Sequence, residues 1–288
     1  MQEFSKSFVP SLERGLAILR ILVKSRAGLS LSQVTRQLNL PKSSAHCLLR
    51  TLEETGYVYR EKSCGKYRVS LSICDLARQA LQGISLREQA RPALRVLVER
   101  TRMTVHMAVM EQRSCVLIEK VVPPGAPRTA TWIGKQLAVH CTAVGKAMLA
   151  HLPEGEVDEL ISEQGLIRYN DNTICSVRQL KQELHAIRLR GYALDDEEEE
   201  IGVRCVGAPI FSASGEVIAA LSIVGEASQI SEEQLPFLCR NVMETAHLVS
   251  EQVRNAQLEA GVSLPERIAH LNWLRNDAGF FSRANSRV

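Results

Sequence analysis

The sequence has few of the features that mark a membrane, fibrous or secreted protein. Its longest apolar stretches, 16–23 and 217–224, are far shorter than the roughly 20 residues that a membrane-spanning helix needs. Only 17 residues are glycine and 10 are proline, which excludes a collagen-like or Pro/Gly-rich chain. The first twenty residues include Glu3, Lys6 and Glu13 and lack the apolar core of a signal peptide. We therefore expect a cytoplasmic protein that does not contact a membrane.

The cysteines are not arranged as metal ligands. All eight are scattered, and no two are separated by the two to four residues of a zinc-binding pair. In a cytoplasmic chain, isolated thiols of this kind are mostly small buried hydrophobic side chains. We therefore expect no metal and no cofactor.

The composition that is present is typical of a globular protein. Of the 288 residues, 45% are hydrophobic and 23% are charged, which excludes wholesale disorder and suits two domains of about 100–150 residues. The net charge of +3 is divided unevenly. Residues 1–70 hold 12 Lys and Arg against five Asp and Glu, a net +7, and the remainder holds 23 against 27, a net −4. This division favours a polyanion such as nucleic acid as the partner of the first part.

Three amphipathic helices are predicted in the basic part. Apolar residues recur at helical spacing over 12–23, after Ser11 as the N-cap. Ser30 begins the capping box of a second helix, and a third helix is predicted over 42–55. Two short helices joined by a tight turn form a helix-turn-helix, here at about residues 31–50.

The third helix carries residue types that bind DNA. Its predicted outward face has short polar or cationic side chains, which can bond phosphate oxygens and base edges in a major groove: Lys42, Ser43, Ser44, His46 and Arg50. A β-hairpin is predicted over 57–60 and 66–70, and its Lys62, Lys66 and Arg68 are candidate phosphate contacts. Winged helices of this kind also occur as protein-binding modules. The cations on the third helix and the hairpin favour double-stranded DNA as the partner.

Beyond residue 70 the sequence predicts two helices and then a mixed domain. The two helices cover 71–81 and 85–100 and flank Gly83. Strands are then predicted at 104–110, 115–122, 128–133, 204–211 and 216–224, and helices at 141–151, 154–164, 176–190 and 231–256. This order is typical of an α+β sensor-like domain with one curved sheet.

Several motifs together make the chain resemble the IclR-type transcriptional regulators, from about residue 12 to residue 251. Segments 11–19 and 40–52 are similar to the first helix and the recognition helix of that family. Three further motifs lie in the C-terminal part: HCTAVGKAMLA at 140–150, GYALDDEE at 191–198, and the hairpin segments 202–209 and 215–222. Each motif alone is modest, but five in register over about 240 residues are specific.

The resemblance implies a winged helix-turn-helix domain (12–73), a helical linker (74–87), a GAF-like α/β effector-binding domain (88–256) and a C-terminal extension (257–288). It also implies a homodimer or a dimer of dimers on a palindromic DNA operator, with a small organic or aromatic acid as effector. The residues that match the effector pocket of the family are Ala143, Val144, Asp195, Cys205 and Ser222. In such a complex we expect the hairpin and Arg14 to contact phosphates.

Two positions depart from the family pattern. Cys47, a further residue of the predicted DNA-binding set, replaces a common arginine, and we expect it to change operator preference. Val224 stands where some relatives have a second serine, which favours an effector larger or more apolar than a very small oxoacid. The predicted helix start at 142–145 favours an anion, because N–H groups at a helix N-terminus are free.

Other features have simpler interpretations. Lys146 lacks the rest of a phosphate-binding loop, and we predict that it lies on the helix surface. The acidic run 195–200 is predicted to be a solvated loop, except for Asp195. No catalytic motif is present, so we expect no enzymatic activity. The alternative function is a redox-sensing regulator that acts through Cys141 or Cys205 and requires an exposed thiol of low pKa.

Overall fold

The chain is divided into two compact units. The computed structural model describes residues 9–82, 84–111, 113–126 and 130–260, and the units separate after residue 83. Most of the predicted C-terminal extension, residues 261–288, lies outside the described residues. None of the described helices is long and apolar enough to cross a membrane.

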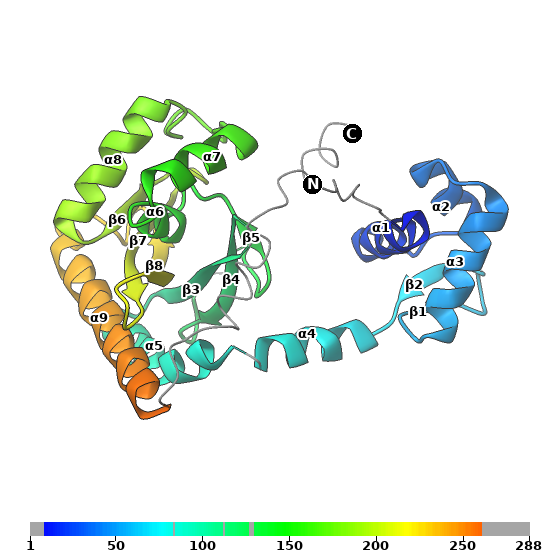
Figure 1. The fold of residues 1–288 in the computed structure, drawn as a ribbon, viewed down its shortest axis with the longest axis horizontal. Helices are drawn as coiled ribbons and strands as arrows, with labels where there is room; N and C mark the ends of the chain where they lie inside the picture. The colour runs from blue at the N-terminus through cyan, green and yellow to red at the C-terminus, as the bar shows by residue number, and fades with distance from the viewer. Residues whose placement is uncertain (1–8, 83, 112, 127–129, 261–288) are drawn as a thin grey trace, which may run out of the picture. The chain divides into compact units, whose positions relative to one another are not determined.

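The N-terminal unit contains four helices and a short hairpin among its described residues (Figure 1). The elements are α1 (Pro10–Lys24), α2 (Leu31–Leu38), α3 (Lys42–Glu54), β1 (Val58–Arg60), β2 (Tyr67–Val69) and α4 (Ser72–Gln82). The predicted cap of the first helix was wrong. Val9 is the N-cap and makes no side-chain bond, while Ser11 lies inside the helix. Pro10 explains the earlier start, because proline has no N–H to leave unpaired in the first helical turn.

The helix-turn-helix has the predicted local signals. Ser30 Oγ accepts a bond from the Gln33 N–H at 3.3 Å, and the Gln33 side chain accepts one from the Ser30 N–H at 2.8 Å, which confirms the capping box. Asn39 then ends α2 in a left-handed conformation with φ of 49°. The core of this unit includes Val34 and Leu49. The unit is therefore a winged helix-turn-helix, with the β1–β2 hairpin as the wing.

The C-terminal unit is built on one antiparallel sheet. Its helices are α5 (Ser85–Thr101), α6 (Ala143–Leu149), α7 (Glu154–Gln164), α8 (Val177–Arg190) and α9 (Leu235–Ala260). Its strands are β3 (Thr104–Glu111), β4 (Ser114–Val121), β5 (Gln136–Leu137), β6 (Ala193–Asp196), β7 (Val203–Phe211) and β8 (Val217–Glu226). The strand order is β5-β4-β3-β8-β7-β6, with every neighbouring pair antiparallel.

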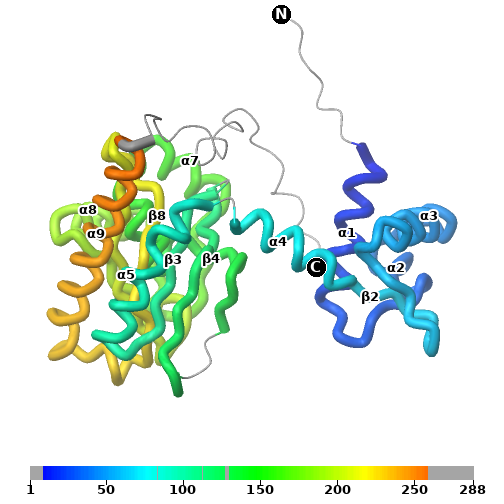
Figure 2. The backbone as a smooth tube through the Cα atoms, turned by 90° about the horizontal axis from the view of Figure 1, so that it is seen from below, coloured from blue at the N-terminus to red at the C-terminus, as the bar shows by residue number. Residues whose placement is uncertain are grey.

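Helices cover both faces of this sheet (Figure 1, Figure 2). Side chains alternate along each strand, so Val206 and Ala208 of β7 join α5 and α9 in one apolar cluster. The opposite face packs against α6, α7 and α8 through a second cluster that includes Leu117 and Ala220. This arrangement confirms the expected fold class: an α+β chain with a winged helix unit and an α/β unit that has one sheet.

One predicted strand was wrong in its described part. Residues 130–133 form no strand, and the edge strand is instead β5, where Leu137 pairs with Cys115. The chain reverses at Gly134, whose φ is +89° and whose N–H donates to the Leu117 carbonyl at 2.7 Å. Glycine adopts this backbone conformation without strain, so pairing starts only after it.

Candidate DNA-binding surface and effector site

Helix α3 has a buried side and an exposed polar side. Ala45 and Leu49 are fully buried against the other helices of the unit. The predicted DNA-binding residues lie around the rest of the helix: Lys42, Ser43, His46, Cys47 and Arg50 are exposed, and Ser44 is half-buried. Arg50 forms an ion pair with Glu54, one turn further along, with Nε 2.8 Å from Oε1. The fold thus brings this predicted set together on an accessible surface.

The other residues predicted to contact phosphates differ in whether they are already paired within the protein. Arg14 is exposed on α1, Lys62 is exposed and Lys66 is half-buried, and none of the three forms an ion pair within the described residues. Arg68 differs, because its Nε lies 2.9 Å from the Glu61 carboxylate and its guanidinium donates to the Arg26 carbonyl at 2.8 Å. Arg68 therefore ties the hairpin to the loop after α1.

Strand register brings three predicted effector residues onto one face of the C-terminal sheet. Asp195 pairs with Cys205, and Ser222 lies on the neighbouring strand opposite Gly207. Alternation places residues 205 and 207 on the same face. Asp195 and Ser222 are each 2% exposed, and Cys205 is partly buried.

Helix α6 lies over this face through a close contact at Gly207, and a second glycine, Gly145, packs against the segment that precedes the helix. A Cβ added to Gly207 would lie 2.9 Å from the backbone of Ala143, and one added to Gly145 would lie 2.5 Å from the Val139 carbonyl oxygen. Ala143 and Val144, the other predicted effector residues, are buried in the first turn of the helix. One N–H of that turn is already satisfied, because the Thr142 hydroxyl accepts from Gly145 at 3.2 Å. The start of α6 is therefore less open to an anion than the sequence indicated.

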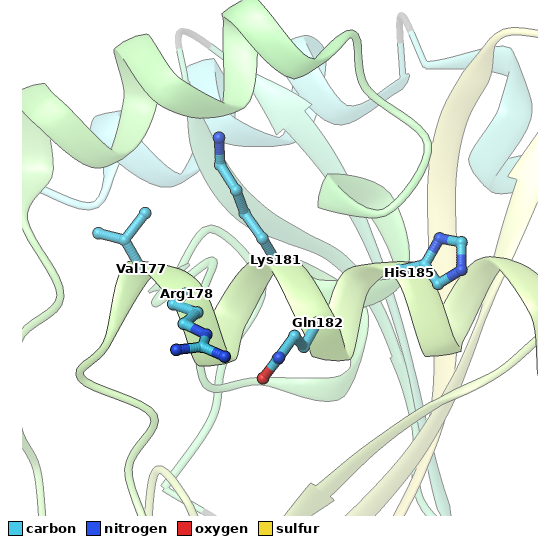
Figure 3. Close-up of a pocket in the computed structure, with 5 residues that line it drawn as sticks. All are labelled: Val177, Arg178, Lys181, Gln182 and His185. Atoms are coloured by element: carbon cyan, nitrogen blue, oxygen red, sulfur yellow. The ribbon is translucent and has the colours of Figure 1, made fainter.

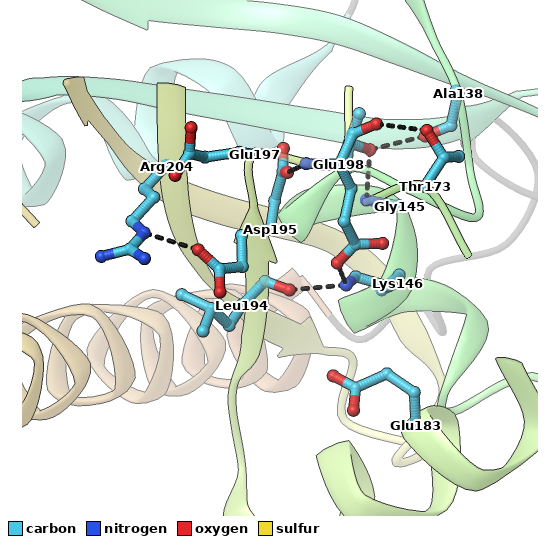
Figure 4. A network of polar contacts seen from close by, with 12 residues as sticks. Ala138, Gly145, Lys146, Thr173, Glu183, Leu194, Asp195, Glu197, Glu198 and Arg204 are labelled. Atoms are coloured by element: carbon cyan, nitrogen blue, oxygen red, sulfur yellow. Dashed lines mark hydrogen bonds and ion pairs between the residues drawn. The ribbon is translucent and has the colours of Figure 1, made fainter. Parts of the chain in front are cut away.

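Lys146 is buried, and the predicted surface position was wrong (Figure 4). Lys146 is 1% exposed. Its ammonium forms an ion pair with Glu198 and donates a hydrogen bond to the Leu194 carbonyl at 2.5 Å. Short apolar residues surround Lys146 along α6, whose other residues are also buried. A lone lysine in an apolar helix was interpreted as exposed because its partner lies 52 residues away in the sequence.

The acidic run 195–200 is likewise not a solvated loop throughout. Glu198 is 5% exposed, its N–H donates to Asp195 Oδ1 at 2.9 Å, and its carbonyl accepts from the Thr173 hydroxyl at 2.7 Å. Figure 4 shows these contacts converging from β6, α6 and the loop before α8. Glu200, by contrast, is exposed as predicted.

Burial changes the protonation of this face. It raises the pKa of Asp195 to about 7, opposed by the Glu198 N–H bond and by the charge of Lys146. The neutral form of Asp195, which can donate as well as accept a hydrogen bond, is therefore favoured much more than for an ordinary aspartate. Burial also lowers the pKa of His106 to about 3, with smaller contributions from Lys120 and Lys135, so this imidazole is neutral.

Sequence reasoning missed several polar neighbours of the predicted effector residues. His106 lies directly opposite both Ser222 on β8 and Lys120 on β4, and its Nε2 is 3.0 Å from the Thr131 hydroxyl oxygen. We call His106, Lys120, Asp195, Cys205 and Ser222 the polar patch. One signal in the sequence could have indicated His106 as a site residue: it is polar and lies between the apolar residues 105 and 107. The strand that contains it is buried on both faces. Its link to Ser222 needed the strand pairing.

The two thiols of the redox alternative do not have the required properties. Burial is the main cause that raises the pKa of Cys141 and of Cys205 above the ordinary thiol value, and nearby acidic side chains raise both further. Hydrogen bonding with the Asp195 side chain also contributes to the raised pKa of Cys205. A thiol that acts as a redox sensor is an accessible thiolate of low pKa, which neither of these is.

A shallow surface groove is present on α8 (Figure 3). It is lined by Val177, Arg178, Lys181, Gln182 and His185, and includes none of the predicted effector residues. Lys181 is engaged with Glu154 and Asp158 of α7.

A winged helix-turn-helix followed by a sheet domain with buried polar groups defines a class of protein: the two-domain transcriptional regulator. Comparison with known families identifies the branch of that class. Residues 78–251 match the bacterial transcriptional regulator IclR C-terminal domain, and residues 11–62 match the IclR helix-turn-helix domain. The chain belongs to the IclR family of DNA-binding transcriptional regulators, which have a C-terminal effector-binding domain.

Relatives cover most of the chain. The transcriptional repressor IclR of Escherichia coli is 34% identical over 244 residues, which are 84% of this chain and 89% of that protein. The crystal structure of the Thermotoga maritima IclR has a TM-score of 0.72 and 33% identity, and the match covers 85% of this chain and 98% of that one. An IclR homologue from Microbacterium hydrocarbonoxydans, crystallised with 4-hydroxybenzoate, has a TM-score of 0.72 and 25% identity over 85% of this chain and 99% of that one.

Proposed function

We propose that the protein is a transcriptional repressor whose affinity for a palindromic DNA operator is controlled by a small organic acid. The acid binds at the polar patch beneath α6, in contact with Ala143 and Val144. The observation that carries this proposal is the strand register, which gathers Asp195, Cys205 and Ser222 beside His106 on one buried face. Polar groups in an otherwise apolar interior are the usual means of orienting a small ligand.

The relatives support the chemical class of the effector. One homologue of the same fold was crystallised with 4-hydroxybenzoate, an aromatic acid with a hydroxyl. In this chain, Val224 lies directly opposite Cys205 and supplies an apolar contact where a very small oxoacid would need a hydrogen bond. A hydroxylated or aromatic acid therefore fits the patch better than a two-carbon acid.

The N-terminal unit supports an assembly of at least two copies. Helix α4 has no buried residue, and Leu76 on it is exposed, as are Leu12 and Leu16 on α1. A second copy of the chain would cover these apolar side chains and present two α3 helices to one operator. In this assignment, residues 12–73 bind DNA, 74–87 link the domains and 88–256 bind the effector.

Selection of binding sites from a random-sequence duplex library tests the proposal. We expect the full-length protein to select inverted repeats whose half-sites are about one helical turn apart. Arg50→Ala is expected to weaken binding to the selected site and to leave weak binding to unrelated duplex unchanged. Millimolar 4-hydroxybenzoate is the first effector probe, measured both by thermal shift and by release of the selected duplex.

The possible outcomes separate the parts of the proposal. Selection of single, unpaired half-sites would contradict the dimer. Equal loss of binding to selected and unrelated duplex in Arg50→Ala would contradict the role of α3 in reading sequence. A panel of organic acids that neither shifts the melting temperature nor releases DNA would contradict the acid effector.

A further inference from the structure

We propose that Lys135 binds the carboxylate of the effector, and that Glu199 occupies Lys135 until the effector arrives. This inference rests on the proposed function, since it assumes that an acid binds at the polar patch. It adds the residue that recognises the acid group and an internal carboxylate that competes with the ligand.

Lys135 is held at the edge of the polar patch by its backbone. Its carbonyl accepts from the Leu117 N–H of β4 at 3.0 Å, and its N–H donates to the Trp132 carbonyl at 3.0 Å. The side chain is 24% exposed, and its ammonium lies 5.7 Å from the centre of the Trp132 ring. The backbone of Lys135 is thus fixed in position, and its side chain is still partly exposed to solvent.

The field of this ammonium reaches into the polar patch. Burial is the main cause that lowers the pKa of His106 and that of Lys120, the two members of the patch on β3 and β4, and the charge of Lys135 lowers both further. Hydrogen bonds place the segment that contains Lys135 at the β3–β4 end of the patch: the Thr131 carbonyl accepts from Lys120 Nζ at 2.8 Å, and the Lys135 carbonyl accepts from the Leu117 N–H of β4. Asp195 on β6 and Cys205 on β7 mark the other end, four and three strands away from β4 in the sheet order. An acid with a polar group at its far end would therefore orient with its carboxylate toward Lys135.

Glu199 now holds the place of that carboxylate. Its Oε1 lies 3.8 Å from Lys135 Nζ, and its side chain is 28% exposed. A direct charge-assisted hydrogen bond between an ammonium and a carboxylate is about 2.7–2.9 Å long, so this ion pair lacks one. Burial is the main cause that raises the pKa of Cys141, Cys205 and Tyr169, and the charge of Glu199 raises each of them further.

The competition favours an acidic ligand for two reasons. Burial raises the pKa of Glu199, which means that its charged form is poorly solvated where it lies. An effector carboxylate that approaches Lys135 to hydrogen-bonding distance forms the stronger contact and releases Glu199 to water. The Trp132 ring beside the ammonium offers a flat apolar surface to the body of the ligand. A neutral analogue does not displace Glu199, because it supplies no charge to Lys135.

Titration calorimetry with three variants of the full-length chain tests this inference. The probes are 4-hydroxybenzoate, benzoate and the neutral 4-hydroxybenzamide. Glu199→Gln is expected to bind both acids about tenfold more tightly than the unsubstituted protein, and Lys135→Met about tenfold more weakly or not at all. Affinity for the amide is expected to stay the same in both. Glu200→Gln removes an exposed charge next to Glu199 and serves as the matched control.

The outcomes distinguish this inference from the proposed function. If the acids bind the unsubstituted chain and neither Glu199→Gln nor Lys135→Met changes their affinity, Lys135 is not the acid-binding residue and the proposed function stands. If Glu200→Gln tightens acid binding as much as Glu199→Gln does, the effect is general electrostatics and the competition is wrong. If no acid binds any variant, both this inference and the choice of acid class are wrong. Melting temperatures of all variants check that each one is folded.

Discussion

The two units of the protein place their charged side chains in opposite environments. In the described part of the N-terminal unit no polar or charged side chain is buried, and the cations predicted to bind DNA lie at or near the surface. In the C-terminal unit Lys146, Glu198, Asp195 and His106 are all buried, each with a polar partner. Charged side chains of the same types are therefore exposed to solvent in the first unit and buried with a polar partner in the second.

The proposed partners account for this difference by their size. DNA presents a continuous array of phosphates, and exposed flexible cations bind it by releasing its counterions. A small effector offers only a few groups, and its site must exclude water and fix polar groups in advance. Burial achieves this, and it also shifts the pKa of Asp195 up and that of His106 down.

The strongest test of the comparison is Lys146→Met. Removal of one partner of a buried ion pair leaves an uncompensated charge, here on Glu198, and typically costs about 3–5 kcal/mol of unfolding free energy. We expect a large fall in the stability of the C-terminal unit, measured by urea unfolding followed by circular dichroism. Arg113→Met is the matched control, because Arg113 pairs with Glu159 and Glu163 at the surface, and it should cost less than about 1 kcal/mol.

The double variant Lys146→Met/Glu198→Met separates charge from packing. If the loss comes from the uncompensated carboxylate, the double variant is more stable than Lys146→Met alone. Equal stability of the two would mean that the lysine stem, rather than the ion pair, supports α6.

Smaller effects on the unfolding free energy are expected when the pH is changed, and those of Asp195 and His106 have opposite signs. Asp195 has a folded pKa of about 7 against an ordinary 3.8, so its neutral form is favoured by folding, and this stabilisation is lost as the pH rises from about 4 to 7. His106 has a folded pKa of about 3 against 6.5, so its contribution is present above pH 6.5 and is lost as the pH falls toward 3. Each slope is at most about 1.4 kcal/mol per pH unit.

Two variants resolve these slopes. Asp195→Asn should make the unfolding free energy rise more steeply, or fall less, between pH 4 and 7 than in the unsubstituted protein. His106→Gln should remove a rise with pH between about 3 and 6.5. Urea unfolding at five pH values measures both, and parallel curves for all three proteins would show that these groups do not keep shifted pKa values in the fold.

The smallest expected effect concerns the wing. Lys62→Ala and Lys66→Ala should each lower the slope of log affinity against log salt by about 1, and should weaken binding to every duplex equally. Arg68→Ala differs, because Arg68 holds Glu61 and the Arg26 carbonyl, and we expect it to lower the melting temperature of the N-terminal unit. Fluorescence anisotropy on a labelled duplex at several salt concentrations makes the measurement. An unchanged slope in both lysine variants would remove the wing from the DNA-binding surface.

Local sequence signals predicted most of the secondary structure. The capping box at Ser30, the helix over 154–164 and the hairpin strands β7 and β8 lie close to where they were expected. These features depend on neighbours within a few residues, so a single sequence records them. The predictions failed where proline or glycine moved a boundary, as at Pro10 and Gly134.

The candidate effector site was only partly accessible from the sequence. Ala143, Val144, Asp195, Cys205 and Ser222 were reached through resemblance, and their contact with an effector stays a prediction. His106 and Lys135 were missed as partners of that site, because their roles depend on groups far away in the chain. Lys146 was misplaced for the same reason.

The sequence by itself determined two units of opposite net charge, the winged helix-turn-helix and the membership of the family, because helix periodicity, capping and motif spacing are properties of short segments. The tertiary structure decided which charges are buried. Strand register set Asp195 beside Cys205 and His106 opposite Ser222, and packing of α6 on Gly207 carried Lys146 into the interior. Burial and pairing depend on contacts between distant segments, and these contacts set the pKa values of Asp195 and His106.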